Sequence, residues 1–116
     1  MSKSILVIDD EETILDTFKI IFEDMGYRVE TFSDPVAGMT EAVKNDYDLI
    51  VTDIRMPGKD GAEVTEGIRK ARPNARILLV TAYPDDPIVP LALEAGAFAL
   101  LKKPFGIAKI LDFLRE

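Results

Sequence analysis

The sequence predicts an α/β protein in which a mainly parallel, five-stranded sheet is covered by helices on both faces. Short continuous apolar runs alternate along the chain with amphipathic helical patterns. A continuous apolar run is typical of a strand buried on both faces, as strands are in parallel sheets. Repeated strand–helix units of this kind stack into a three-layer α/β/α, doubly wound architecture.

Five segments are expected to form the strands. Four continuous apolar runs predict buried strands at Ile5–Ile8, Leu49–Val51, Ile77–Val80 and Phe98–Leu101. A weaker alternating run predicts the remaining strand at Tyr27–Phe32.

The helix after the first strand has the clearest pattern. Apolar residues recur along one stripe, and they are Ile14, Leu15, Phe18, Ile21, Phe22 and Met25. Gly26 follows as a C-terminal stop signal, because glycine readily adopts the left-handed conformation that ends many helices.

The other helices are marked by their end signals. The second begins at Asp34–Pro35, an N-cap followed by proline at the first helical position, and fades near Asn45–Asp46. The third spans about Asp60–Ala71. The fourth begins near Asp86–Pro87 and ends at Gly96, and the fifth spans about Gly106–Arg115.

The length and composition predict one soluble domain over residues 1–116. The net charge of −7 argues against nucleic-acid binding by this domain, although acidity can also serve solubility alone. No apolar run approaches the roughly 20 residues that cross a bilayer, and no secretory signal precedes the first strand. With no cysteine either, we expect a cytoplasmic location.

Polar residues follow four of the five predicted strands. They are Asp9–Asp10, Asp53, Thr81 and Lys103, and the carboxyl ends of parallel strands share one edge, where ligands bind. Three carboxylates against one lysine would raise carboxylate pKa values or attract a divalent cation. Oxygen ligands alone favour a hard ion such as Mg²⁺.

Each of these residues also has a purely structural explanation when taken alone. Asp9–Asp10 could cap the following helix, and Asp53 could be a turn residue. Thr81 could be an ordinary strand-end hydroxyl, and Lys103 could be a solvated surface charge. The hypothesis of a site therefore depends on their coincidence at one edge of one sheet.

In four segments the chain resembles the response regulator receiver domain of two-component systems, the CheY-like family. The segments are Ile5–Glu11, Asp48–Gly61, Leu79–Tyr83 and Leu101–Phe105, each around a predicted strand end, and the likeness covers essentially the whole chain. It implies a flavodoxin-like fold with strand order 2-1-3-4-5. The chain would be a phosphoacceptor signalling domain that assists its own phosphorylation and dephosphorylation, and not a separate enzyme.

The resemblance implies a role for each acidic residue. Asp53 would accept the phosphoryl group from a sensor histidine kinase or phosphotransfer protein. Asp10 would bind Mg²⁺ directly, Asp9 would do so directly or through water, and Asp53 and the backbone carbonyl of Arg55 would complete the protein's metal ligands. The chain has no histidine, so phosphohistidine chemistry must come from a partner.

The same resemblance implies the residues that hold the phosphoryl group. Thr81 and the backbone N–H of Ala82 would each donate a hydrogen bond to a phosphoryl oxygen. Lys103 would pair with the phosphoryl group, and its peptide bond to Pro104 would be cis. The output would pass to a C-terminal effector domain of a longer protein or to a separate protein target.

Five positions depart from the usual family pattern or bear on its kinetics. Leu100 stands where many members carry an aromatic residue, and Pro84 and Pro90 stiffen the region after Thr81. These three predict an atypical output switch or an altered fourth helix. Arg55 and Tyr83 are bulky at positions that flank the path of the hydrolytic water in the family, which predicts slow autodephosphorylation.

Two alternatives lead to other functions. A phosphatase of the haloacid dehalogenase type also uses an aspartate nucleophile, but its acids are spaced Asp-x-Asp after the first strand, whereas Asp9 and Asp10 are adjacent. A receiver fold used as a phosphorylation-independent interaction module would fit Leu100 and Pro84. Binding of a phosphoryl mimic would discriminate between the module and the phosphoacceptor.

Overall fold

The computed structural model describes residues 3–115, and it contains the ten predicted elements in the predicted order. The predicted domain also includes Met1, Ser2 and Glu116, which lie outside the described residues. The strands are β1 Ser4–Ile8, β2 Arg28–Phe32, β3 Leu49–Asp53, β4 Ile77–Thr81 and β5 Ala99–Lys102. The helices are α1 Glu12–Asp24, α2 Pro35–Lys44, α3 Gly61–Ala71, α4 Ile88–Ala95 and α5 Ile107–Arg115.

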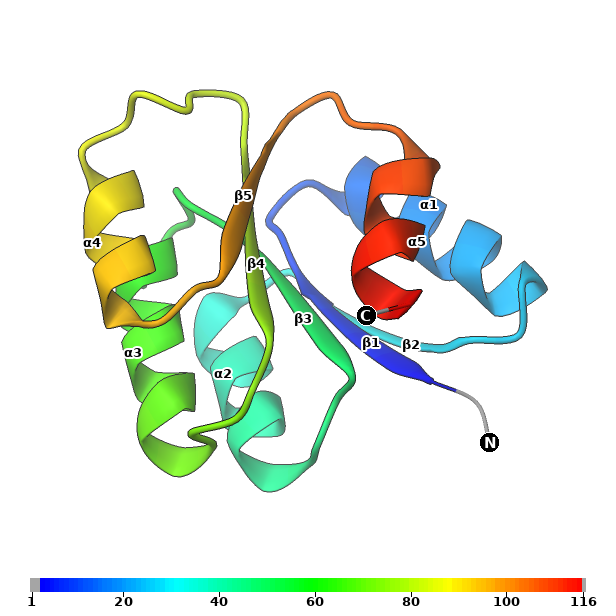
Figure 1. Cartoon of the computed structure of the whole chain (residues 1–116), viewed down its shortest axis with the longest axis horizontal. Coiled ribbons are helices and arrows are strands. Elements are labelled where there is room, and N and C mark those ends of the chain that lie inside the picture. Colours follow the sequence, from blue (N-terminus) through cyan, green and yellow to red (C-terminus); the bar gives the residue numbers. More distant parts are fainter. Residues whose placement is uncertain (1–2, 116) are drawn as a thin grey trace.

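The strands form one parallel sheet in the order β2-β1-β3-β4-β5, which confirms the predicted topology. Helices α1 and α5 cover one face, and α2, α3 and α4 cover the other (Figure 1). The chain order reverses between β1 and β3, because β2 lies on one side of β1 and all later strands lie on the other. In sheets of this kind, ligands bind beside that reversal, at the carboxyl ends of the strands.

The buried strands hold the two apolar cores apart. Successive side chains of β1 point to opposite faces, so Ile5 and Val7 pack with α1 and α5, whereas Leu6 and Ile8 pack with α2 and α3. All five residues of β1, β3 and β4 are buried, as the continuous apolar runs predicted. Two cores on a rigid central sheet fix the positions of the strand ends.

Two aspartates set where helices begin. Asp34 accepts hydrogen bonds from the backbone N–H groups of Val36 and Ala37 at 3.3 Å, which confirms the predicted cap of α2. Asp60 forms a capping box with Glu63 at the start of α3. This box ends the β3–α3 loop a few residues after Asp53.

Two predicted core positions were wrong. Met25 is 49% exposed, because α1 ends at Asp24 and the helical spacing no longer turns Met25 inward. Phe98 precedes β5 and is 40% exposed. Its ring packs edge-on against Phe113, with centroids 5.3 Å apart, and under the guanidinium of Arg76.

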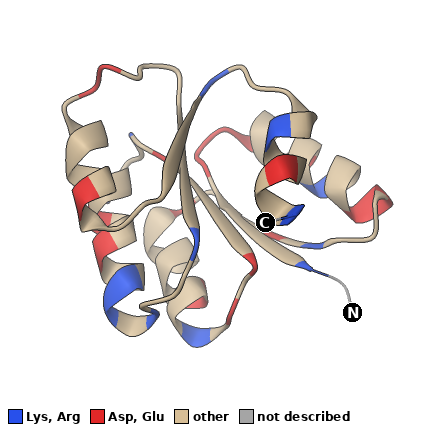
Figure 2. Ribbon diagram, in the orientation of Figure 1, with Lys and Arg blue, Asp and Glu red and all other residues tan. Residues whose placement is uncertain are grey.

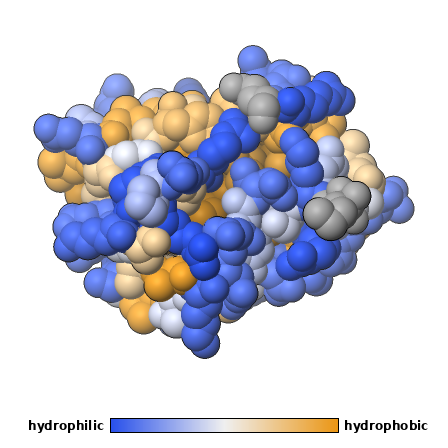
Figure 3. Space-filling view, turned by 60° about the horizontal axis from the view of Figure 1, so that its bottom comes forward, coloured by the Kyte–Doolittle hydropathy of each residue, from blue (hydrophilic) through white to orange (hydrophobic). Residues whose placement is uncertain are grey.

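The face that includes the amino edge of the sheet is mainly hydrophilic. Figure 3 turns the lower end of the molecule in Figure 1 forward and shows polar residues over most of that face, with separate apolar patches between them. Among residues 3–115, no helix is both long enough and apolar enough to cross a membrane.

Candidate functional site

Parallel pairing brings the predicted site residues to one edge of the sheet. Asp9 directly follows β1, Asp53 and Thr81 are the last residues of β3 and β4, and Lys103 directly follows β5. Figure 2 shows the acidic segment after β1 and the basic segment after β5 at this carboxyl edge, the upper end in Figure 1. The predicted convergence is confirmed for these four residues.

Three carboxylates form an acidic cluster. Asp9, Asp10 and Asp53 each offer an oxygen, and these oxygens all lie within 4.8 Å of one another. Asp9 is fully buried and Asp53 is 8% exposed, whereas Asp10 is exposed to solvent. A cluster of carboxylate oxygens that is open on one side suits a hard divalent cation that keeps some of its waters.

Backbone donors orient the two buried carboxylates. Oδ1 of Asp53 accepts a hydrogen bond from the N–H of Ile54 at 2.8 Å, and Oδ1 of Asp9 accepts one from the N–H of Glu11 at 3.0 Å. Oδ2 of Asp9 is buried and lies 2.8 Å from Nζ of Lys103, with which it forms an ion pair. A buried carboxylate oxygen needs a compensating positive charge, which the lysine or a bound cation can supply.

Lys103 is the cation of the site. Its Nζ lies 3.2 Å from Oδ2 of Asp53 and 3.0 Å from Oε1 of Glu11, in addition to the Asp9 contact. The Lys103–Pro104 peptide bond is cis, as the family resemblance implied. Glu11 was not predicted as a site residue. Its position two residues after Asp9 was the available signal, but only the fold brings it to a lysine 92 positions away.

Burial and charge shift the protonation of Asp53. Burial raises the pKa of Asp53 to about 6, helped by repulsion from Asp9, while Lys103 and the Ile54 N–H oppose the rise. Burial alone would lower the pKa of Lys103, but hydrogen bonds from Lys103 to Asp9 and Glu11 and the charges of Asp9 and Asp53 raise it overall. Lys103 therefore stays protonated, and one cation faces an excess of negative charge.

The start of α3 approaches the end of β3 closely. A Cβ atom added to Gly61 would lie 2.8 Å from the carbonyl oxygen of Asp53 and 3.1 Å from Cα of Ile54. Both neighbours are backbone atoms, so they cannot move aside as the tip of a side chain can. Gly61 also donates its N–H to the carbonyl of Ile54 at 2.7 Å. Glycine is therefore required here to hold the loop that carries Asp53.

Thr81 and Ala82 lie at the end of β4, beside β3. Val80 is paired with Asp53 in the sheet, so Thr81 is one residue beyond that pair. Thr81 is nearly inaccessible to solvent, and its Oγ1 accepts a hydrogen bond from the N–H of Tyr83 at 3.0 Å. Ala82 is exposed at the start of the following loop.

The side chain of Arg55 is engaged outside the acidic cluster. Its guanidinium binds the carboxylate of Asp86 through two hydrogen bonds of 2.7 and 2.8 Å. Asp86 was predicted only as part of the start of the fourth helix. The pairing joins residues 31 positions apart, so no local pattern indicated it.

The comparisons with known proteins agree on one family. The model of the response regulator receiver domain family matches residues 5–115. The alkaline phosphatase synthesis transcriptional regulatory protein PhoP of Bacillus subtilis is 39% identical over 106 residues, which cover 91% of this chain and 44% of PhoP. Sporulation initiation phosphotransferase F of Bacillus subtilis is 28% identical over all of this chain and 94% of its own length. The chain thus spans less than half of PhoP and nearly all of the phosphotransferase.

A solved structure shows the same fold. The receiver domain of the sensor histidine kinase PA1611 from Pseudomonas aeruginosa superposes with a TM-score of 0.89 and 27% identity, over 99% of this chain and 96% of that domain. That structure holds a magnesium ion coordinated in its active-site cleft.

Proposed function

Because this chain belongs to the response regulator receiver domain family of two-component signal transduction, we propose that Asp53 accepts a phosphoryl group in an Mg²⁺-dependent reaction. The observation that carries this assignment is the position of Asp53. It is the carboxylate of the acidic cluster that ends β3, is slightly open to solvent, and lies 3.2 Å from a lysine. An acceptor needs that access, whereas Asp9 is fully buried.

The acidic cluster and one backbone oxygen are the proposed metal ligands. Asp9, Asp10 and Asp53, whose oxygens lie within 4.8 Å of one another, would hold the ion together with the backbone carbonyl of Arg55. The close approach of one oxygen from each of the three carboxylates supports this donor set. When bound, Mg²⁺ supplies positive charge that neutralises the phosphoryl oxygens and offsets the repulsion among the carboxylates.

The chain's own residues then favour transfer. An oxygen of ionised Asp53 forms the new O–P bond while the bond from phosphorus to the donor breaks. Lys103, the hydroxyl of Thr81 and the N–H of Ala82 stabilise the charge on the equatorial oxygens. With a pKa of about 6, Asp53 is mostly ionised at neutral pH. The same groups would assist hydrolysis of the acyl phosphate.

A groove beside the site is the proposed contact for the phosphodonor. It lies between α1 and the β5–α5 loop, and its lining includes Lys103 and the apolar side chains of Ile14, Phe18, Pro104 and Phe105. We propose that a sensor histidine kinase or phosphotransfer protein binds there and presents its phosphohistidine to Asp53. We also propose that the output passes to an effector domain or to a separate protein target. The single domain over residues 1–116 and the cytoplasmic location remain predictions.

Intact mass spectrometry tests the proposal. Wild type incubated with a small-molecule phosphodonor and Mg²⁺ should gain one phosphoryl group, and Asp53→Asn should gain none. Asp48→Asn is the matched control, because Asp48 is an exposed aspartate at the opposite end of β3, and it should behave as wild type. A folded wild type without an adduct would instead support the interaction module.

The predicted slow autodephosphorylation has its own test. The Tyr83 side chain is 72% exposed on the loop after Thr81, and we propose that it obstructs water that approaches the acyl phosphate. We expect Tyr83→Ala to shorten the lifetime of the adduct, measured by mass after removal of the phosphodonor. An unchanged lifetime would contradict this role of Tyr83.

A further inference from the structure

An ion pair connects the loop after β3 to the start of α4. Nε of Arg55 lies 2.7 Å from Oδ2 of Asp86, and a second guanidinium nitrogen lies 2.8 Å from Oδ1. Two parallel hydrogen bonds fix both the distance and the relative orientation of the groups, which a single contact does not. The Asp86 side chain is only 9% exposed, although that of Arg55 is 60% exposed.

The Arg55 end of this pair is attached to the acidic cluster. Arg55 is two residues after Asp53, and the intervening Ile54 donates its N–H to the Asp53 carboxylate at 2.8 Å. The carbonyl of Ile54 is held by the N–H of Gly61 at 2.7 Å. A change in the position of the Asp53 carboxylate therefore acts directly on the Asp53–Ile54 peptide, and Arg55 follows one residue later in the chain.

The Asp86 end is attached to the first turn of α4. Oδ1 of Asp86 accepts a hydrogen bond from the N–H of Ile88 at 2.9 Å, and its carbonyl accepts one from the N–H of Val89 at 2.9 Å. The formal N-cap residue, Pro87, makes no side-chain cap hydrogen bond. The carboxylate that binds Arg55 is thus also the group that caps the helix.

We propose that the Arg55–Asp86 pair transmits occupancy of the acidic cluster to the first turn of α4. This inference rests on the proposed function, since it takes a metal or phosphoryl group at Asp53 as the input. Binding there moves the Asp53–Ile54 peptide and, with it, the backbone at Arg55. Because the guanidinium is held at two points, Asp86 follows, and the N–H groups that Asp86 caps change their environment. Arg55 and Asp86 are therefore positioning residues for the output.

Backbone amide NMR on the whole chain tests the proposal. Labelled wild type is titrated with Mg²⁺ and then with beryllofluoride, a phosphoryl mimic. The amides of Ile54 and Arg55 should shift, and those of Ile88 and Val89 should shift with them. In Asp86→Asn, the side-chain oxygen can still cap Ile88 but the ionic pair is lost. Ile54 and Arg55 should still respond in that variant, whereas most of the response at Ile88 and Val89 should disappear.

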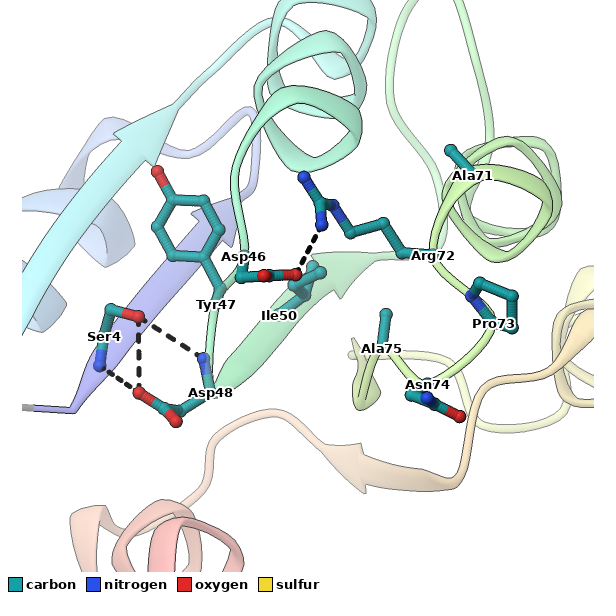
Figure 4. A pocket seen from close by; sticks show the side chains of 10 residues that line it. All are labelled: Ser4, Asp46, Tyr47, Asp48, Ile50, Ala71, Arg72, Pro73, Asn74 and Ala75. Atoms are coloured by element: carbon teal, nitrogen blue, oxygen red, sulfur yellow. Dashed lines mark hydrogen bonds and ion pairs between the residues drawn. The ribbon is translucent and has the colours of Figure 1, made fainter.

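Two further variants serve as a second test of the pair and as a control. Arg55→Gln breaks the pair from the other end without touching the cap, so it should give the same loss at Ile88 and Val89. Asp46→Asn removes a comparable ion pair, with Arg72, at the opposite edge of the sheet (Figure 4) and should respond as wild type.

The outcomes separate the two claims. A full response of Ile88 and Val89 in both pair variants, or no response there in wild type, would overturn the coupling and leave the phosphoacceptor intact. No response of Ile54 and Arg55 in wild type would count against the proposed function itself, and the coupling would fail with it.

Discussion

The two edges of the sheet both carry acidic residues, but these residues differ in burial and in the partners that compensate their charge. At the amino edge, Asp48 accepts the N–H of Ser4 at 2.7 Å, and Asp46 binds Arg72 at 2.6 Å (Figure 4). Both residues are exposed to solvent. At the carboxyl edge, Asp9 and Asp53 are buried around a single lysine.

This difference separates structural acids from functional ones. An exposed acid with its own partner costs the protein little, whereas buried carboxylates in excess of their cations destabilise the fold until another cation arrives. The groove at the amino edge is lined by Asp46, Asp48 and Arg72, whose charges are compensated or solvated. We infer from the uncompensated charge that the carboxyl edge is the functional site.

The largest expected effect comes from removal of the central cation. In metal-free protein, Lys103→Met leaves two buried carboxylates without their partner and should lower the free energy of unfolding by about 3 kcal/mol. Arg72→Met, at the amino edge, should cost about 1 kcal/mol because Asp46 is 87% exposed and stays hydrated. Urea denaturation of the two variants gives both values, and equal losses would remove the distinction between the edges.

Addition of Mg²⁺ should stabilise the folded protein, and the gain should depend on the acids of the carboxyl edge only. A ligand that binds the folded state at about 100 times its Kd adds about 2.7 kcal/mol to the free energy of unfolding. We expect wild type to approach this gain, and Asp10→Asn to lose most of it because a proposed metal ligand is gone. Thermal unfolding at increasing Mg²⁺ measures the effect. Asp46→Asn is the control, and a gain that depended on Asp46 would contradict the assignment.

Neutralising one acid at each edge should change the free energy of unfolding in opposite directions. Without metal at pH 7, Asp53→Asn relieves burial and repulsion and should raise the free energy of unfolding by about 1 to 3 kcal/mol. Asp48→Asn weakens the hydrogen bond from Ser4 and should lower it by about 1 kcal/mol. Chemical denaturation decides the signs, and a destabilised Asp53→Asn would show that the carboxylate is structural.

The smallest effect is a pH dependence of metal-free stability. The pKa of Asp53 rises from 3.8 to about 6 on folding, so the folded state binds the proton more tightly. The stabilisation from this proton is fully present below pH 3.8 and is lost as pH rises to about 6. Between pH 5 and 7, this group should lower the free energy of unfolding by about 1 kcal/mol. A similar loss in Asp53→Asn would assign the dependence to other groups.

Much of the fold was predictable because its signals are local. Continuous apolar runs located β1, β3 and β4, and the cap at Asp34 located α2. The edge that holds the site followed from the order of strands, since parallel strands share their carboxyl ends. The same rule correctly predicts that Asp9, Asp53 and Lys103 lie together, because each stands at or directly after the end of a strand.

The remaining features depend on contacts across the chain. Glu11 accepts a hydrogen bond from Lys103, 92 residues away, and Arg55 donates one to Asp86, 31 residues away. Nothing near Arg55 in the sequence distinguishes a side chain that faces the acidic cluster from one that binds a helix cap. Burial likewise separates Asp9 from Asp10, two adjacent residues of one type, and only the packing around β1 decides which is exposed.

Chemical location of the phosphoryl group tests the central claim most directly. Borohydride reduces an aspartyl phosphate to homoserine, so peptide mass spectrometry after phosphorylation with Mg²⁺ and reduction identifies the acceptor. We predict homoserine at position 53 in wild type and none when Mg²⁺ is removed. Homoserine at position 9 or 10, or label at Asp53 that forms equally well without the metal, would contradict the assignment of the carboxyl edge as an Mg²⁺-dependent phosphoacceptor site.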